Sequence, residues 1–233
     1  MSRERHVPTL KRAHASAHPA TVPAMGDLVS PAGDPAVQDA HRRGRILWAL
    51  ATCMAEKGYR ATTISDIAAA ARVSKTVVYT HFRDKEDCLL ELYSRATDKV
   101  LERIREAQAR ARAEGLPWRD RVHACITAYL EAMASGPAVA WAALVEVQAA
   151  GRTALSLRRD VVDRYVALLT GVAVELARDH PGEVRPVRRE LLLAAVGGIN
   201  ELMLARVERG DAAHLADDAD VATAVLVGLL ERR

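Results

Sequence analysis

The side chains best suited to chemistry in this sequence are hydroxyls and basic groups gathered in residues 62–87, TTISDIAAAARVSKTVVYTHFRDKED. Such groups donate hydrogen bonds to phosphates and to base edges, and an exposed valine offers methyl groups to a thymine. Residues 41–83 hold eight Lys or Arg against two Asp or Glu, a formal charge of +6, whereas the whole chain carries +3. The segment therefore predicts a nucleic-acid contact rather than a catalytic centre.

Two helix starts lie close together in this segment. Thr63 stands three residues before Asp66, which is the spacing of a capping box, and Ser74 can cap a second helix by accepting from the amide of Thr76 or Val77. Only residues 71–73 separate the two helices, so we expect them to cross steeply as a helix-turn-helix. The predicted buried anchors of the second helix are Val73, Val78 and Phe82. The predicted outward residues are Ser74, Lys75, Thr76, Val77, Thr80 and His81.

Elements spread over residues 45–89 match a family pattern. They are Arg45, Ile46 and Leu47, then Gly58-Tyr59, Thr62-Thr63, Ile67-Ala68, Val73-Ser74, Val78-Tyr79, His81-Phe82 and Lys85-Glu86. In this region the chain resembles the TetR family of bacterial transcriptional regulators. It departs from the pattern at Arg72, where the turn usually has glycine, and at Cys53-Met54, where a phenylalanine is usual. A turn position with positive φ is easiest for glycine, so Arg72 should cost up to about 1 kcal/mol.

The resemblance implies a division of labour on DNA. Phosphate contacts would come from Arg43, Arg45, Thr63, Tyr79 and Lys85, and base-edge contacts from Lys75, Thr76, Val77 and Thr80. The rest of the predicted DNA-binding set is Thr62, Arg72, Ser74 and His81. Tyr79 and His81 also have a structural interpretation, because an aromatic ring near a helix end often only seals a core. Base contacts should set operator choice, whereas phosphate contacts set register and affinity.

The sequence divides into three predicted parts. Residues 1–38 are rich in proline and alanine without helical periodicity, so we expect a disordered arm whose basic and acidic groups nearly cancel. Residues 39–84 form the predicted DNA-binding domain, and residues 85–233 the predicted ligand-binding and dimerisation domain. No run of about 18 apolar residues and no secretory signal is present, so we expect a cytoplasmic bacterial protein without a membrane contact, associated with the nucleoid when bound to DNA.

Helical periodicity continues to the carboxyl end. Asp84 can cap a long helix that reaches about Ala113, and further helices are predicted over residues 118–134, 138–150, 153–179, 186–209 and 215–231. The predicted class is all-α, with a three-helix amino-terminal domain joined to a helical bundle and about nine helices in total. The family pairs its last two helices across a twofold axis. The predicted homodimer interface is Leu191, Ala194, Gly198, Leu202, Ala222, Val225, Leu226 and Leu229; the same pattern alone also fits a monomer core.

The family also keeps an effector cavity in its second domain. The candidate walls are Trp118, Tyr129, Met133, Trp141, Leu144, Tyr165, Leu169 and Met203, and the candidate polar anchors are Glu146, Gln148, Asn200 and Glu201. Most of these side chains also fit an ordinary core. Glu146 and Asn200 interrupt apolar runs, so if buried they must be paired or face a ligand. The effector's identity is not encoded in any motif.

These features predict a regulator that is not an enzyme and needs no metal or cofactor. The three cysteines, at 53, 88 and 125, form no metal-ligand spacing and should behave as small apolar side chains. We expect a repressor that binds a pseudo-palindromic operator in double-stranded DNA as a dimer, released when a small molecule shifts the helix that starts near Asp84. The alternatives are an activator of the same family, a protein-binding adaptor, or an enzyme using Glu146, His123 and Tyr129.

Overall fold

The computed structural model describes residues 35–232, and over this range the chain forms nine α-helices, two 3₁₀ turns and no β-strand. The helices are α1 (Pro35–Ala61), α2 (Ile64–Ala71), α3 (Lys75–His81), α4 (Lys85–Ala113), α5 (Trp118–Ala134), α6 (Pro137–Leu144), α7 (Arg152–Asp179), α8 (Arg189–Glu208) and α9 (Ala219–Leu230), and the 3₁₀ turns are η1 (Glu146–Ala149) and η2 (Ala212–Asp218). The predicted all-α class is confirmed. The predicted arm, residues 1–38, lies almost wholly outside the described residues.

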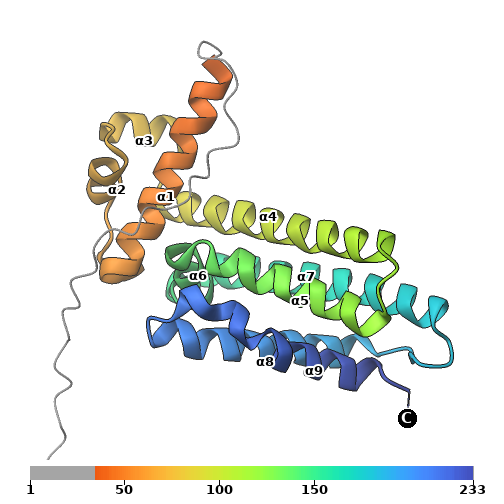
Figure 1. Ribbon diagram of the computed structural model, residues 1–233. Coiled ribbons are helices and arrows are strands. Elements are labelled where there is room, and N and C mark those ends of the chain that lie inside the picture. Colours follow the sequence, from red (N-terminus) through yellow and green to blue (C-terminus); the bar gives the residue numbers. More distant parts are fainter. Residues whose placement is uncertain (1–34, 233) are drawn as a thin grey trace, which may run out of the picture. The chain divides into compact units, whose positions relative to one another are not determined.

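Residues 40–233 form one compact unit. In this unit α1, α2 and α3 lie together at one end of the long helix α4, and the other helices lie along α4 (Figure 1). We call α1–α3 the head and α4–α9 the body. Helix α4 packs on α5 and α7, while α8 packs on α7 and α9. None of the helices described here combines the length and apolarity that a bilayer crossing requires.

Local signals in the sequence start the head helices where they were predicted. The Thr63 hydroxyl accepts from the amide of Asp66 while the Asp66 carboxylate accepts from the amide of Thr63, which completes the capping box. Ser74 Oγ accepts from the amide of Val77 at 3.2 Å, and α3 begins one residue later. The Asp66 pKa lies well below its usual range, first because Lys57 donates to the carboxylate and then because Thr63 does.

Arg72 occupies the left-handed backbone region at the turn between α2 and α3, with φ 54°. Among residues 35–232 it is the one non-glycine residue with a positive φ. We therefore predict that Arg72→Gly raises the free energy of unfolding by up to about 1 kcal/mol, because the β-carbon strain disappears. Chemical denaturation checks this, and Arg72→Ala, which keeps the β-carbon, should show no such gain.

The body follows the predicted pattern with three differences. The predicted helix 138–150 is interrupted after α6 and continues as η1, the helix predicted from 186 begins at Arg189, and the helix predicted from 215 is preceded by the 3₁₀ turn η2. Asp84 caps α4 as predicted, by accepting from the amide of Asp87 at 2.8 Å. The three cysteines are free and buried, and burial raises the pKa of the Cys88 and Cys125 thiols to about 12 and about 11.

The residues predicted to form the dimer interface fall into two groups, one buried and one at the surface of α8 and α9. Ala222 and Leu226 are buried in the body's own core, at 0% and 2% exposed. The prediction that they lie at a surface interface is therefore wrong. Leu191, Ala194, Gly198 and Val225 are exposed, whereas Leu202 and Leu229 are half-buried. Apart from the adjoining helix backbone, no atom of the described residues lies within 4 Å of the position that a β-carbon on Gly198 would take, so the backbone there is open to close approach.

Candidate nucleic-acid interface

Helix α3 presents a row of polar side chains at the surface of the head. Ser74, Lys75, Thr76, Tyr79 and Thr80 are exposed, and Tyr79 retains 56% of its surface. The opposite side of the helix is anchored by Val78 and Phe82, at 0% and 2% exposed. Burial of these two anchors turns the hydroxyls and the Lys75 ammonium outward, which is the inventory that reads a major groove.

The burial of Val73, Val77 and His81 differs from the prediction. Val73, predicted as a buried anchor, is only half-buried, and Val77 and His81 are also half-buried. The Thr80 hydroxyl donates to the carbonyl of Val77 at 2.8 Å, so its proton is used within the helix while its lone pairs stay available.

The predicted DNA contact through Thr62 is wrong in this conformation. Thr62 is only 1% exposed, and its hydroxyl donates to the carbonyl of Gly58 at 2.8 Å. It therefore closes the α1–α2 junction. The neighbouring Thr63 stays exposed, although its hydroxyl donates to Asp66 at 2.6 Å as part of the cap.

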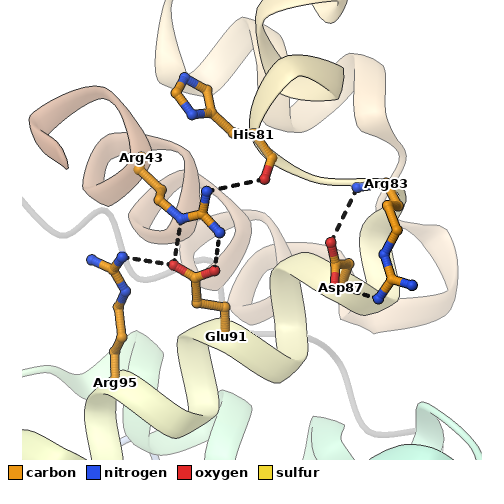
Figure 2. Close-up of polar contacts among 6 residues, drawn as sticks. All are labelled: Arg43, His81, Arg83, Asp87, Glu91 and Arg95. Atoms are coloured by element: carbon orange, nitrogen blue, oxygen red, sulfur yellow. Dashed lines mark hydrogen bonds and ion pairs between the residues drawn. The ribbon is translucent and has the colours of Figure 1, made fainter. Parts of the chain in front are cut away.

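Arg43 was predicted as a phosphate contact, but its guanidinium is bonded to other groups of the protein (Figure 2). Both sides of the group donate to the Glu91 carboxylate on α4, with Nε at 2.6 Å from Oε1, and NH1 donates to the His81 carbonyl at the end of α3 at 3.1 Å. The guanidinium also lies over the Phe82 ring, 4.6 Å from its centre. This clamp joins α1, α3 and α4, so α4 holds the end of the recognition helix.

The electrostatics of the clamp agree with its geometry. The hydrogen bond from Arg43 is the largest cause that holds the pKa of Glu91 below its ordinary value, and Arg95 adds an ion pair at 2.8 Å. Figure 2 also shows a second pair at the surface, in which Arg83, just before α4, lies 2.8 Å from Asp87 in the first turn of α4. Glu91 was not among the predicted site residues, and nothing in its local sequence marks it.

Two further predicted phosphate contacts donate to backbone carbonyls. Lys85 Nζ donates to the carbonyls of Tyr59 and Thr62, at 2.6 and 2.8 Å, and lies 4.1 Å from the centre of the Tyr59 ring. Burial lowers the Lys85 pKa, as expected for an ammonium taken partly out of water. Arg45 donates to the Ala71 carbonyl at the end of α2, at 2.8 Å, but its side chain stays at the surface. Lys85, unlike the prediction of a phosphate contact, therefore has its ammonium bonded to two backbone carbonyls of the head.

Glu146 was predicted as a polar anchor of the effector cavity, and the structure gives it two protein partners. Its Oε2 accepts from the backbone amide of Tyr59 at 2.7 Å, and its Oε1 accepts from the indole nitrogen of Trp141 at 3.0 Å. The carboxylate thus bridges the head and the body. The sequence did signal an unusual group here, because Glu146 interrupts an apolar run.

The remaining effector candidates fall into separate environments. Tyr129 donates to Asn200 at 3.1 Å, its ring lies 5.4 Å from that of Tyr165, and burial raises the pKa of both phenols. Trp118 and Met203 are core residues, and Trp118 donates to Glu183 at 3.0 Å. Gln148 and Glu201 are exposed; Met133, Trp141, Leu144 and Leu169 are half-buried and pack on the main core.

A surface cleft of about 470 Å³ lies elsewhere, between α4 and α7. It is lined by Arg105, Gln108, Ala109, Arg112, Ala113 and Glu175, none of which was predicted. Glu175 accepts from Gln108 and Arg121 at 2.9 Å each and pairs with Arg112 at 2.6 Å. Arg121 is 5% exposed, so this ion cluster forms one wall between the cleft and the core.

The three residues of the rival enzymatic interpretation are bonded to different partners. His123 lies 3.2 Å from Asp220, Tyr129 donates to Asn200, and Glu146 bonds Tyr59 and Trp141. The head instead has the architecture of a helix-turn-helix DNA-binding domain: two capped helices with a polar outer face. A long helix joins it to an all-helical body.

The comparisons with known proteins agree with this class. The family model described as bacterial regulatory proteins, tetR family, matches residues 46–92. Residues 46–92 therefore carry the amino-terminal domain that this family model describes. The chain is 36% identical over 114 residues to the transcriptional repressor KstR2 of Rhodococcus jostii, a match that covers 48% of this chain and 54% of that protein. It is 32% identical over 90 residues to the transcriptional activator FasR of Mycolicibacterium smegmatis, covering 39% of each chain. The chain thus spans about half or less of these relatives' length.

Solved structures extend the likeness to the whole fold. The fatty acid degradation regulator FadR from Bacillus halodurans superposes with a TM-score of 0.69 at 19% identity, covering 79% of this chain and 97% of that one. FadR from Bacillus subtilis, solved in complex with stearoyl-CoA, gives a TM-score of 0.68 at 20% identity and the same coverage. At these identities the likeness establishes the fold, including the helical body.

Proposed function

We propose that this protein is a ligand-responsive repressor that binds a pseudo-palindromic operator as a homodimer and leaves it when a small molecule enters the body. The observation that carries the DNA-binding part is the exposed row of Lys75, Thr76, Tyr79 and Thr80 on α3, supported from behind by Val78 and Phe82. An activator remains the second candidate, because the relatives include the activator FasR beside the repressor KstR2.

The proposed release mechanism uses α4. This helix begins at the head, where Glu91 holds Arg43 and the end of α3, and it continues along α5 and α7 in the body. A ligand that displaces α4 by packing against its body half would move the clamp and change the spacing of the two recognition helices of a dimer. The coupling is reciprocal, so operator DNA must weaken the binding of that ligand by the same factor.

The proposed effector is an amphipathic anion of the acyl-CoA class. Support comes from the stearoyl-CoA complex of the structurally similar FadR and from the cleft beside α4, where Arg105 and Arg112 offer guanidinium groups. Arginine suits phosphate groups because its planar fork donates two parallel hydrogen bonds. Glu175 already pairs with Arg112, so Arg105 is the stronger candidate for a phosphate contact.

The experiment that tests this function is an electrophoretic mobility assay with DNA that flanks the coding region, repeated with stearoyl-CoA. We expect a sequence-selective, salt-dependent shift that weakens as stearoyl-CoA is added, while free coenzyme A has little effect. No selective shift at low salt would contradict DNA recognition. A selective shift that saturating stearoyl-CoA leaves unchanged would contradict only the effector class.

Substitutions at two lysines distinguish a residue that contacts bases from one that stabilises the head. Lys75→Ala should change the preferred operator sequence at a cost of about 1–3 kcal/mol on the best site, because Lys75 is exposed on α3. Lys85→Ala should lower the stability of the head without changing the salt slope of DNA binding, because Lys85 Nζ is occupied by the Tyr59 and Thr62 carbonyls. Binding titrations at several salt concentrations measure both. A slope that falls by about one in Lys85→Ala would restore Lys85 as a phosphate contact.

A further inference from the structure

We infer that Glu146 is a positioning residue that transmits the position of α6 directly to the α1–α2 junction, by a route separate from α4. The inference goes beyond the proposed release mechanism, which acts through the Arg43–Glu91 clamp. Its regulatory meaning rests on the proposed function, but the contact itself can be tested without DNA or effector.

The proposed connection begins at the backbone of Gly58. This residue has φ 82° and ψ 159°, a conformation that side-chain-bearing residues rarely adopt, and it interrupts the helical geometry of α1. The interruption turns the amide of the next residue, Tyr59, out of the helical ladder and toward the body. Tyr59 itself is buried, so its amide needs a partner within the protein. That partner is Glu146, whose oxygen lies 2.7 Å away.

The other oxygen of the Glu146 carboxylate connects to α6. Oε1 of Glu146 accepts from the indole nitrogen of Trp141 at 3.0 Å, and Trp141 lies on α6 with its ring against the main core of the body. Among residues 35–232 these two N–H groups are the hydrogen-bond donors of the carboxylate, and no basic side chain pairs with it. Each oxygen therefore serves one part of the molecule, and neither can turn without weakening a bond.

On the head side, Tyr59 and Gly58 connect to α4 and α2 through their backbone carbonyls. The Tyr59 carbonyl accepts from Lys85 at the first turn of α4, and the Gly58 carbonyl accepts from the amide of Thr62 at 3.2 Å. The junction leads after Thr62 into the cap of α2, and α2 packs on the recognition helix α3. A displacement of Trp141 would thus reach α2 and α3 through one carboxylate and a few backbone bonds.

The test is hydrogen–deuterium exchange at the Tyr59 amide in the full-length protein. Glu146→Ala should raise the exchange rate of this amide by about tenfold or more, because a hydrogen bond to a charged acceptor is lost. Glu146→Gln, which keeps one acceptor oxygen, should give an intermediate rate. Gln148→Ala is the matched control on η1, since its side chain donates only to the Leu144 carbonyl, and it should exchange as wild type.

Transmission from α6 is tested by Trp141→Phe, which keeps a smaller aromatic ring at this position and removes the indole donor. This change lies outside the head, yet we expect it to raise exchange at Tyr59 several-fold, and to have no further effect in the Glu146→Ala background. A wild-type rate in Trp141→Phe, or additive effects in the double variant, would overturn transmission through Glu146. A wild-type rate in Glu146→Ala overturns the contact, and Glu146→Gln decides in the same way if the alanine variant does not fold. None of these rates depends on DNA or stearoyl-CoA, so a failure of the proposed function would be seen separately.

Discussion

Glu91→Ala is expected to weaken operator binding about tenfold or more while leaving the helix content unchanged. The substitution removes the acceptor of the Arg43 guanidinium and frees the end of α3, which Arg43 holds through the His81 carbonyl. The pair is only partly buried, with side chains 30% and 22% exposed, so we expect a loss of unfolding free energy of about 1–2 kcal/mol, below that of a fully buried ion pair. Binding titrations and chemical denaturation measure the two effects.

A double-mutant cycle assigns this effect to the clamp. Arg43→Ala and Glu91→Ala should cost less together than the sum of their separate losses, because each removes the same interaction. Arg83→Ala is the matched control for stability. It breaks the exposed Arg83–Asp87 pair at the start of the same helix, and a surface pair of this spacing contributes about 0.5 kcal/mol or less. Additive losses in the cycle would mean that Arg43 and Glu91 act independently.

The clamp also predicts a pH dependence of stability. Arg43 lowers the pKa of Glu91 in the folded state, so the ionised carboxylate stabilises the fold above the unfolded pKa, which is about 4.3 for glutamate. That contribution disappears as the pH falls through the folded pKa. The stability difference between wild type and Glu91→Ala should therefore be constant near neutral pH and shrink below about pH 4. A difference that grows on acidification would contradict the pair.

Val225→Glu is expected to convert the proposed homodimer to a monomer and to lower affinity for a two-half-site operator by about a hundredfold or more. Val225 and Val221 on α9 are 41% and 55% exposed, and Leu191 on α8 is 36% exposed. If a second copy covers this surface, a carboxylate there is buried without a partner, at a cost of several kcal/mol. Loss of the dimer removes the second recognition helix from the complex. Analytical ultracentrifugation and DNA titration give the two readouts.

A second exposed valine controls for the chemistry of this change. Val174 on α7 is 65% exposed, so Val174→Glu also places a charge on an apolar surface position. It should remain dimeric and bind DNA as wild type does. If Val174→Glu dissociates the dimer and Val225→Glu does not, the interface lies on α7. Leu226→Ala should instead destabilise the monomer itself, by about 2–5 kcal/mol, because Leu226 is a core residue.

Much of the head follows from local sequence. The capping box of Thr63 and Asp66, the caps at Ser74 and Asp84, and the left-handed Arg72 were all predictable, because each depends on atoms within a few residues. The same holds for α4 and α5, whose apolar periodicity and bounding glycine and proline lie within one segment. The interruption between α6 and η1 was not predictable, because their apolar residues continue the pattern without a break in composition.

The partners of long polar side chains were decided only by the tertiary structure. Arg43 meets Glu91 at a separation of 48 residues, Lys85 meets Tyr59 at 26, and Tyr59 meets Glu146 at 87. A basic side chain near a recognition helix can reach a phosphate or turn inward to a carbonyl, and its residue type is the same in both cases. Likewise, Ala222 and Leu226 belong to the same helical stripe as Val225, but packing on α5 and α8 decides which of them remains at the surface. Sequence therefore determined the helices and the reading surface, because caps and periodicity are short-range; packing decided which charges hold the head to the body, because that depends on groups far apart in the chain.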